Sequence, residues 1–159
     1  MKQYGGDLET AFAALGRSFY IPEEGGRYHM EQRFHDFHRG ELYYADLDPV
    51  FGHEQGGTRP VLVLQNDVGN YYSPTLIVTA ATRRTFKKPS QPTHVVLDDA
   101  EGLEPSLFML EVIRTIDKRR VRSYVGRLTE EQMEQIDAAL RVSLHLDEDA
   151  FLPTELEAP

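Results

Sequence analysis

The stretch FGHEQGGTRPVLVLQND, residues 51–67, holds an acid, an amide and an arginine in a glycine-rich loop that leads into an unbroken apolar run. Arg59 stands where the loop ends, and Pro60 follows it. Because proline lacks an N–H, Pro60 is consistent with the start or edge of a strand. A guanidinium anchored there can form hydrogen bonds with Glu54 or with the loop carbonyls and so hold the loop in place. Alternatively, it can be one half of a functional site. The spacing alone leaves both interpretations open.

The elements that would position this arginine are short strands. Segments 40–47, 60–66, 74–82, 93–99 and 106–117 are apolar or alternating, and turns rich in Gly, Pro, Asn and Asp separate them, including 66–74. Such spacing predicts a compact antiparallel sheet or small barrel. A helix is predicted over 128–146, because Thr129 and Gln132 match a capping box. Its apolar stripe consists of Met133, Ile136, Leu140 and Leu144.

The chain of 159 residues suits one domain with additional material at its ends. We predict an N-terminal extension over 1–38, partly helical or disordered, a central domain over 39–146 and an acidic tail over 147–159. The absence of cysteine excludes disulfides and thiol chemistry. No window approaches the ~18 apolar residues of a membrane span, and the N-terminus does not match a signal peptide, so we expect a cytoplasmic protein.

The charge is unevenly distributed. The chain has a net charge of −9, yet residues 39–128 carry 12 Lys+Arg against 11 Asp+Glu, and the flanks carry 5 against 15. The bases of the middle concentrate in two groups: Arg83, Arg84, Lys87 and Lys88, then Arg114, Lys118, Arg119, Arg120 and Arg122. These groups are either two solvated loops or a local groove for a phosphate backbone.

Residues 39–82, RGELYYADLDPVFGHEQGGTRPVLVLQNDVGNYYSPTLIVTAAT, resemble the MazF/PemK/Kid toxins of type II toxin–antitoxin systems. The similarity continues through PTHVVLD, MLEVIRTIDK and the last helix, so it covers about 39–146. Its most specific parts are EQGGTRPV and the later AAT. The resemblance implies a mainly β fold, an SH3-like small antiparallel β-barrel with a C-terminal helix, and a homodimer.

The same resemblance implies a sequence-selective endoribonuclease, an mRNA interferase, that cleaves single-stranded RNA without a metal or other cofactor. Its products carry a 2′,3′-cyclic phosphate, or a 3′-phosphate, and a 5′-OH. The resemblance implies that Arg59 and Thr82 are catalytic. The predicted substrate-binding residues are His53, Glu54, Gln55, Arg83, Arg84, Glu111 and Arg114. The expected partners are RNA, a cognate antitoxin and a second copy of the chain, with no membrane.

The residue types fit this chemistry, because the RNA supplies its own 2′-OH as nucleophile. A fixed guanidinium and a hydroxyl donor would stabilise charge on the phosphate, each contact being worth about 3 kcal/mol. Arginine, with a pKa above ~12, is a poor general base. His53 and Glu54 are therefore candidate proton carriers. Val112 replaces a glutamine common in relatives, which predicts a changed or relaxed base preference.

Two other functions on the same fold remain open. A gyrase-poisoning toxin of this fold relies on a C-terminal tryptophan, and this chain has no tryptophan. A catalytically silent RNA-binding module is disfavoured by the presence of both Arg59 and Thr82. Either one of the two ends, the N-terminal extension or the acidic tail DEDAFLPTELEAP, folds back across the RNA groove and damps activity, or the ends only add solubility.

Overall fold

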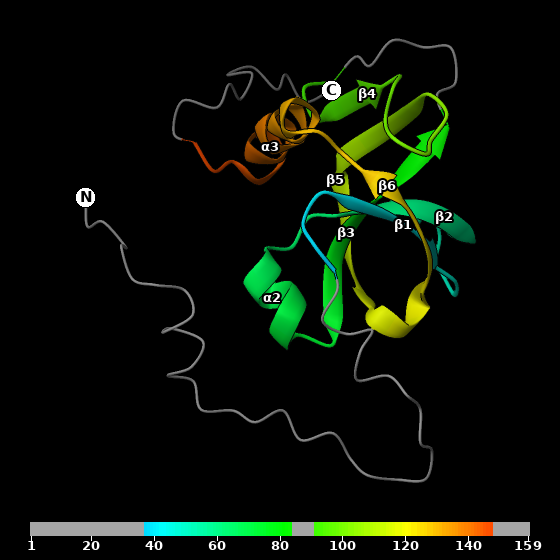
Figure 1. Cartoon of the computed structure of the whole chain (residues 1–159). Helices are drawn as coiled ribbons and strands as arrows, with labels where there is room; N and C mark the ends of the chain where they lie inside the picture. Colours follow the sequence, from blue (N-terminus) through cyan, green and yellow to red (C-terminus); the bar gives the residue numbers. More distant parts are fainter. Residues whose placement is uncertain (1–36, 84–90, 148–159) are drawn as a thin grey trace, which may run out of the picture.

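The computed structural model describes residues 37–83 and 91–147. Most of the predicted extension, most of the acidic tail and Arg84 lie outside these ranges, so the hypotheses placed on them stay predictions. The elements are β1 (Glu41–Asp46), β2 (Thr58–Val63), α2 (Asp67–Tyr72), β3 (Thr75–Arg83), β4 (His94–Leu97), β5 (Ser106–Asp117), the 3-10 helix η1 (Lys118–Arg120), β6 (Val121–Arg127) and α3 (Glu130–Leu144), as seen in Figure 1. None of the described helices is long and apolar enough to cross a membrane.

The six strands form one antiparallel sheet in the order β4-β5-β3-β2-β1-β6. The predicted mainly β fold with a C-terminal helix is therefore confirmed. No ladder joins β4 to β6 among the described strands, so the sheet has two edges and is not a closed barrel. The central strands β3 and β2 each have a hydrogen-bonded neighbour on both sides. A side chain placed on either strand is held by the whole sheet.

Two apolar clusters lie on the two sides of the sheet. One includes Leu62, Phe108 and Ile136 and contains the inner face of α3. The other includes Val61 and Val63. Strand β2 is thus buried on both faces, because successive side chains of a strand point in opposite directions. This double burial explains the unbroken apolar run that follows Arg59 in the sequence.

Helix α3 begins with the predicted capping box. The Thr129 hydroxyl accepts from the Gln132 amide N–H at 3.2 Å, and the Gln132 side chain accepts from the Thr129 N–H at 2.9 Å. The apolar stripe is shorter than predicted. Ile136 is buried and Met133 and Leu140 pack against the core, but Leu144 is 49% exposed because it lies in the last turn.

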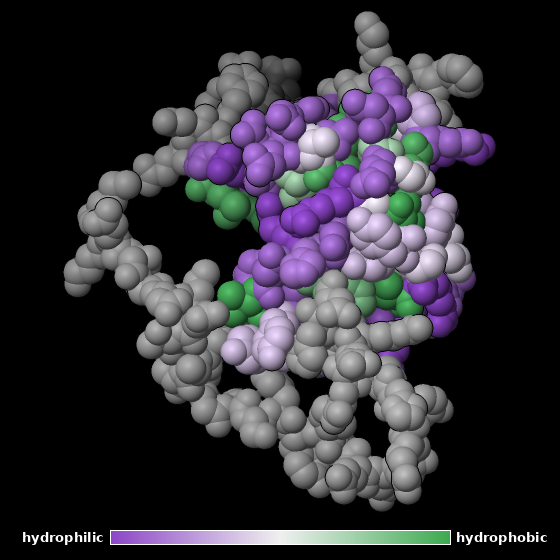
Figure 2. Space-filling view, in the orientation of Figure 1, coloured by the Kyte–Doolittle hydropathy of each residue, from purple (hydrophilic) through white to green (hydrophobic). Residues whose placement is uncertain are grey.

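Two elements differ from the sequence prediction. Residues 67–72, predicted as part of a turn, form the short helix α2, with Asn66 accepting from the Gly69 N–H at 2.8 Å. Strand β6 was not predicted at all; it is an edge strand with mostly exposed side chains, which weakens the alternation that reveals a strand. On the face shown in Figure 2, hydrophilic residues predominate and apolar ones form small separate areas.

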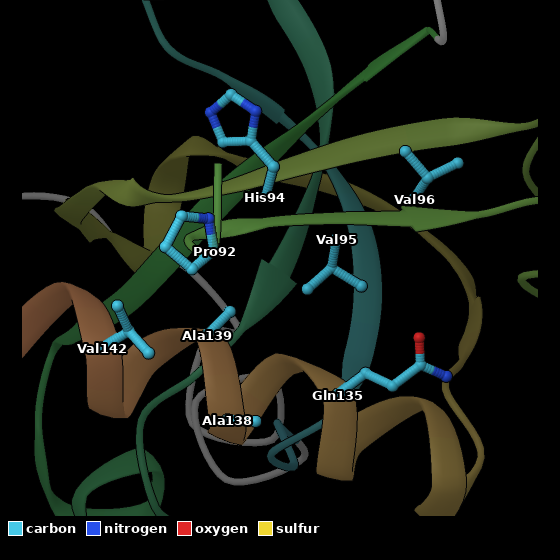
Figure 3. A pocket seen from close by; sticks show the side chains of 8 residues that line it. All are labelled: Pro92, His94, Val95, Val96, Gln135, Ala138, Ala139 and Val142. Carbon is cyan, nitrogen blue, oxygen red and sulfur yellow. The ribbon is translucent and has the colours of Figure 1, made fainter. Parts of the chain in front are cut away.

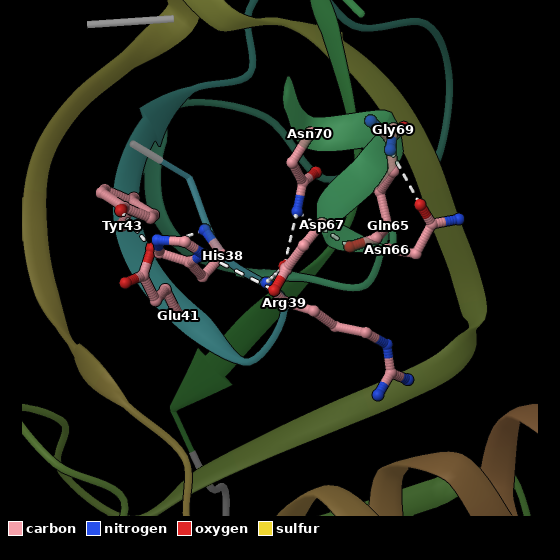
Figure 4. Close-up of polar contacts among 9 residues, drawn as sticks. All are labelled: His38, Arg39, Glu41, Tyr43, Gln65, Asn66, Asp67, Gly69 and Asn70. Atoms are coloured by element: carbon pink, nitrogen blue, oxygen red, sulfur yellow. Dashed lines mark hydrogen bonds and ion pairs between the residues drawn. The ribbon is translucent and has the colours of Figure 1, made fainter. Parts of the chain in front are cut away.

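Helix α2 is held by contacts from distant parts of the chain. Asp67 accepts from the Arg39 backbone N–H at 2.7 Å and lies 3.5 Å from His38 Nδ1 (Figure 4). Asn70 is buried, donates to the Gln65 carbonyl at 2.9 Å and, through its own carbonyl, accepts from Lys118. Because Arg39 and Lys118 are far from α2 in sequence, local pattern could not show the contacts that hold residues 67–72 in place.

Candidate active site

The loop between β1 and β2 closes on itself at its base. The Leu47 N–H donates to the Gly57 carbonyl at 3.0 Å, and the Gly57 N–H donates to Asp48 Oδ1 at 2.9 Å. Gly57 has φ +76°, which other residues rarely adopt. At Gly56 a Cβ would stand 2.5 Å from Asp48 Oδ1. Both glycines are therefore required by the geometry of the closure.

Gln55 connects this loop to two strands of the sheet. Its side-chain amide Nε2 donates to Thr82 Oγ1 on β3 at 2.8 Å, and its carbonyl accepts from Arg114 Nη1 on β5 at 3.3 Å. The other amide atom, Oε1, is buried and has no hydrogen-bond partner among the described residues. The loop thus lies against the end of β3, where the Thr82 hydroxyl accepts a hydrogen bond from the Gln55 side chain.

Arg59 lies near the start of β2, beside this loop. Its Nε donates to the Gly56 carbonyl at 2.6 Å, so the arginine does tie a loop carbonyl, as one interpretation of the sequence proposed. Its terminal nitrogens have no hydrogen-bond partner among residues 37–83 and 91–147. The β2–β3 ladder ends at the pair Val61 and Ala80, and Arg59 and Thr82 each lie two residues beyond this pair.

Glu111 lies in an irregular part of β5, where Thr79 pairs with Ile113 and Ala81 pairs with Phe108. The buried hydroxyl of Thr79 donates to the carbonyls of Met109 at 3.3 Å and Val112 at 3.0 Å, which fixes the bulge. A bulge redirects the side chains that it contains. Here the bulge directs the Glu111 side chain toward the neighbouring edge strand β4.

The partner of Glu111 is His94, which sequence reasoning missed. His94 Nε2 lies 2.7 Å from Glu111 Oε1. Burial would raise the pKa of Glu111, but hydrogen bonds from Thr93, its own backbone and His94, with the charge of His94, hold it below its ordinary value. His94 and Val96 point away from α3, whereas Val95 points toward it (Figure 3). No local signal singles out His94, because its role depends on the pairing of β4 with β5.

Comparison with known proteins gives a consistent result. The model of the PemK-like, MazF-like toxins of type II toxin–antitoxin systems matches residues 38–144. The chain belongs to this family. It is 52% identical over 110 residues to Endoribonuclease EndoA of Bacillus subtilis (strain 168), across 68% of this chain and 94% of the relative.

Solved structures of similar fold support the assignment of this PemK/MazF-like toxin. MazF from Deinococcus radiodurans matches with a TM-score of 0.59 and 25% identity, over 68% of this chain and 96% of that one. An endoribonuclease from a Mycobacterial species, solved in complex with its cognate antitoxin, matches with a TM-score of 0.59 and 24% identity, over 69% and 96%. At this identity these likenesses concern the fold.

The toxin brings together only part of the predicted substrate-binding set. Glu54 is exposed and accepts from the Phe51 N–H at 3.1 Å, so its carboxylate turns toward its own loop. His53 is exposed in the same loop. Arg83 is exposed and pairs with Glu104. Among the described residues no cluster of three or more potential metal ligands is present.

The second basic group of the toxin has a structural role. Arg120 donates to the carbonyls of Asp46 and Asp48, and Arg122 Nη2 lies 3.4 Å from Asp46 Oδ2. Lys118 is buried, and burial lowers its pKa. Arg119 pairs with Asp117 at 2.9 Å. These bases hold the β1–β2 loop and the turn after β5. Because Arg84, Lys87 and Lys88 of the first group lie outside the described residues, the basic groove stays a prediction.

A separate groove of about 470 Å³ lies between β4 and α3 of the toxin (Figure 3). It is lined by Pro92, His94, Val95, Val96, Gln135, Ala138, Ala139 and Val142. Val95 points to the side of the sheet that α3 covers, whereas the His94 side chain points to the other side (Figure 3). The groove therefore does not contribute to the arrangement around Gln55 and Thr82.

Proposed function

We propose that this PemK/MazF-like toxin is a metal-independent endoribonuclease that cleaves single-stranded RNA, with mRNA as the expected target. The observation that supports the proposal is that two adjacent residues of the β1–β2 loop contact the two side chains: Gln55 contacts the Thr82 hydroxyl, and the Gly56 carbonyl accepts from Arg59. The name of the Bacillus subtilis relative, an endoribonuclease 52% identical to this chain, supports the same activity.

The reaction begins with attack of the RNA 2′-OH on the adjacent phosphorus atom. The new O2′–P bond forms, the P–O5′ bond breaks, the proton of the 2′-OH passes to a base, and the O5′ leaving group takes up a proton. The products are a 2′,3′-cyclic phosphate, which can open to a 3′-phosphate, and a 5′-OH. The protein therefore supplies charge stabilisation and proton transfer, with no covalent nucleophile of its own.

Arg59 and Thr82 stabilise the transition state. The terminal nitrogens of Arg59 bind non-bridging phosphate oxygens, and a charge-assisted contact of this kind strengthens as negative charge develops. The Thr82 hydroxyl accepts from the Gln55 amide and can donate its own proton to the same phosphate at the same time. Gln55 thus holds the hydroxyl in place while it donates. Arg114 supports the loop through the Gln55 carbonyl.

Proton transfer is assigned to the loop residues His53 and Glu54. A neutral imidazole has one nitrogen that can accept a proton and one that can donate, which suits a general base or acid. Glu54 accepts from the Phe51 N–H through Oε2, and its other oxygen can accept a proton from the substrate. The arginines Arg83 and Arg84 would contact phosphates on either side of the cleaved bond. Glu111, held by His94, would accept from a base edge.

The biological context follows from the family. As a toxin of a type II system, the protein would be inhibited by a cognate antitoxin and would act in the cytoplasm. The Mycobacterial endoribonuclease was solved with its cognate antitoxin, and the shared fold supports an equivalent partner here. A homodimer is expected from the same family.

The test uses long single-stranded RNA with excess EDTA and compares it with DNA of the same sequence. We expect cleavage of RNA alone, with 5′-OH ends that accept phosphate from polynucleotide kinase without prior dephosphorylation. Arg59→Ala should abolish cleavage, whereas Arg127→Ala, an exposed arginine of β6, should not. Cleavage that is equal in both variants would point to a contaminating nuclease. Cleavage of DNA, or none without added metal, would contradict the mechanism.

A further inference from the structure

Phe51, in the β1–β2 loop, is the most exposed large hydrophobic residue of the described chain. Its side chain is 86% exposed, against 37% for its neighbour Val50. The three residues that follow it are Gly52, His53 and Glu54, all exposed and none apolar. A docking surface for another protein is normally a continuous apolar patch. Phe51 instead presents one isolated flat ring among polar groups.

The loop holds this ring outward by specific contacts. The Phe51 N–H donates to Glu54 Oε2 at 3.1 Å, and the Glu54 N–H donates to the Phe51 carbonyl at 3.2 Å. Gly52 lies between them with φ +58°, which turns the chain. The two reciprocal hydrogen bonds close the turn. The backbone that carries Phe51 is therefore ordered, while its ring faces solvent.

The ring lies close to the candidate active site. Phe51 is four residues from Gln55, so their Cα atoms are at most about 14 Å apart even in an extended chain. The closed turn shortens this separation. Gln55 in turn contacts Thr82 at 2.8 Å. A polynucleotide whose phosphate reached Thr82 would pass the loop within one or two nucleotides.

We propose that Phe51 is a stacking platform for an unpaired base of the RNA, next to the phosphate that is cleaved. The proposal rests on the proposed endoribonuclease function and adds a binding residue to it. Every base has a π-face, so stacking on an aromatic ring tolerates different sequences and requires a single strand. Stacking on Phe51 thus favours single-stranded over base-paired RNA, and groups such as Glu111 would determine which base is bound.

A single-tryptophan variant tests the stacking directly, because the chain contains no tryptophan. Phe51→Trp is combined with Thr82→Ala, which prevents cleavage, and is titrated with an unstructured 12-nucleotide RNA. We expect strong quenching of the tryptophan fluorescence. Inorganic polyphosphate of equal charge should not quench it. The matched control is Leu146→Trp in the same background, 64% exposed after the end of α3, which should respond to neither.

Equal quenching by RNA and polyphosphate, or no quenching while RNA binds, would overturn the proposal. This experiment does not depend on catalysis. If the wild-type protein fails to cleave RNA, the proposed function fails, but quenching by RNA still supports base stacking at Phe51.

Steady-state kinetics provide a second measurement. Phe51→Ala should raise KM for single-stranded RNA about tenfold and change kcat less than about twofold, because stacking acts on binding. Phe51→Tyr, which keeps the ring, should restore KM. If Phe51→Ala leaves KM unchanged but shifts the monomer–dimer equilibrium in sedimentation, the ring belongs to a protein interface and the proposal is wrong.

Discussion

Arg39 and Arg59 occupy similar positions and have different surroundings. Each is half-buried: Arg39 lies two residues before β1, and Arg59 is the second residue of β2. Each donates its Nε to a backbone carbonyl, of Leu64 at 2.9 Å and of Gly56 at 2.6 Å. Arg39 also forms an ion pair with Asp137 of α3. Arg59 has no carboxylate partner among the described residues. The terminal nitrogens of the first arginine are used by the protein, and we propose that those of the second bind the RNA phosphate.

We propose that this difference separates a structural from a functional arginine. Burying a charge is costly unless it is paired, so a guanidinium with no carboxylate partner among the described residues, at the start of a central strand, requires an explanation. Arg39 joins the start of β1 to α3 and thereby stabilises the fold. Arg59 keeps its charge available on a rigid strand, which is what the electrostatic stabilisation of a phosphate needs.

The largest expected effect is the loss of activity in Arg59→Ala. Removal of a fixed donor to a developing oxyanion typically costs 10²–10³ in rate, about 3–4 kcal/mol. We expect this loss in kcat for RNA cleavage, while the midpoint of urea unfolding stays close to that of the wild type, because Arg59 gives up only one hydrogen bond to the Gly56 carbonyl. A large fall in stability would show that the two arginines do not differ as described.

Thr82→Val should lower kcat by about 10², near the lower end of that range. The substitution keeps the shape and removes the hydroxyl, so it also releases the Gln55 amide. Thr82→Ser keeps the donor and should retain most of the activity. An active Thr82→Val protein would show that the hydroxyl only anchors the loop and that Arg59 acts without it.

Arg39→Ala should affect stability and leave catalysis nearly unchanged. It removes the hydrogen bond to Leu64 and the pair with Asp137, and hydrogen bonds of charged groups contribute about 1.5–3 kcal/mol. The side chains of this pair are about one third exposed, so we expect the lower part of that range. Urea unfolding gives the free energy, and RNA cleavage under native conditions gives kcat. A wild-type midpoint would contradict the structural role of Arg39.

The elements and site residues that could be predicted from the sequence are those whose signal lies in neighbouring residues. The capping box of α3 and the run of β5 were predicted because each depends on neighbouring residues. Helix α2 depends on Arg39 and Lys118, and β6 has few buried residues, so neither was visible locally. Arg59 and Thr82 were identified through resemblance. His94 was missed, because its pair with Glu111 exists only after β4 and β5 have paired.

The smallest effect concerns the pH dependence of stability at the corner of α2. Burial would raise the pKa of Asp67, but the Arg39 N–H, His38 and Asn70 outweigh it and hold the pKa below its ordinary value of 3.8. A depressed folded-state pKa stabilises the protein above the unfolded value, and this contribution is lost as pH falls through the folded value.

The melting temperature of the wild type should therefore fall more steeply below about pH 4 than that of Asp67→Asn. Thermal unfolding between pH 6 and 3 measures both curves, and their difference isolates Asp67 from other acids. Parallel curves would show that Asp67 does not contribute. We expect no corresponding loss of stability at low pH from the surroundings of Arg59, because no carboxylate pairs with its guanidinium among the described residues.

The bulge pinned by Thr79 has a consequence for how this protein could diversify. On either side of it the ladder is regular, with Val78 facing Arg114 and Thr82 facing Leu107. Leu110 is buried in the core, but substitutions at 109, 111 and 112 can alter the side chains beside His94 without moving Thr82 or Arg114. We expect that descendants of this gene could acquire new target preferences through these positions while inheriting the cleavage step intact. A selection library confined to them would explore specificity at little risk to turnover.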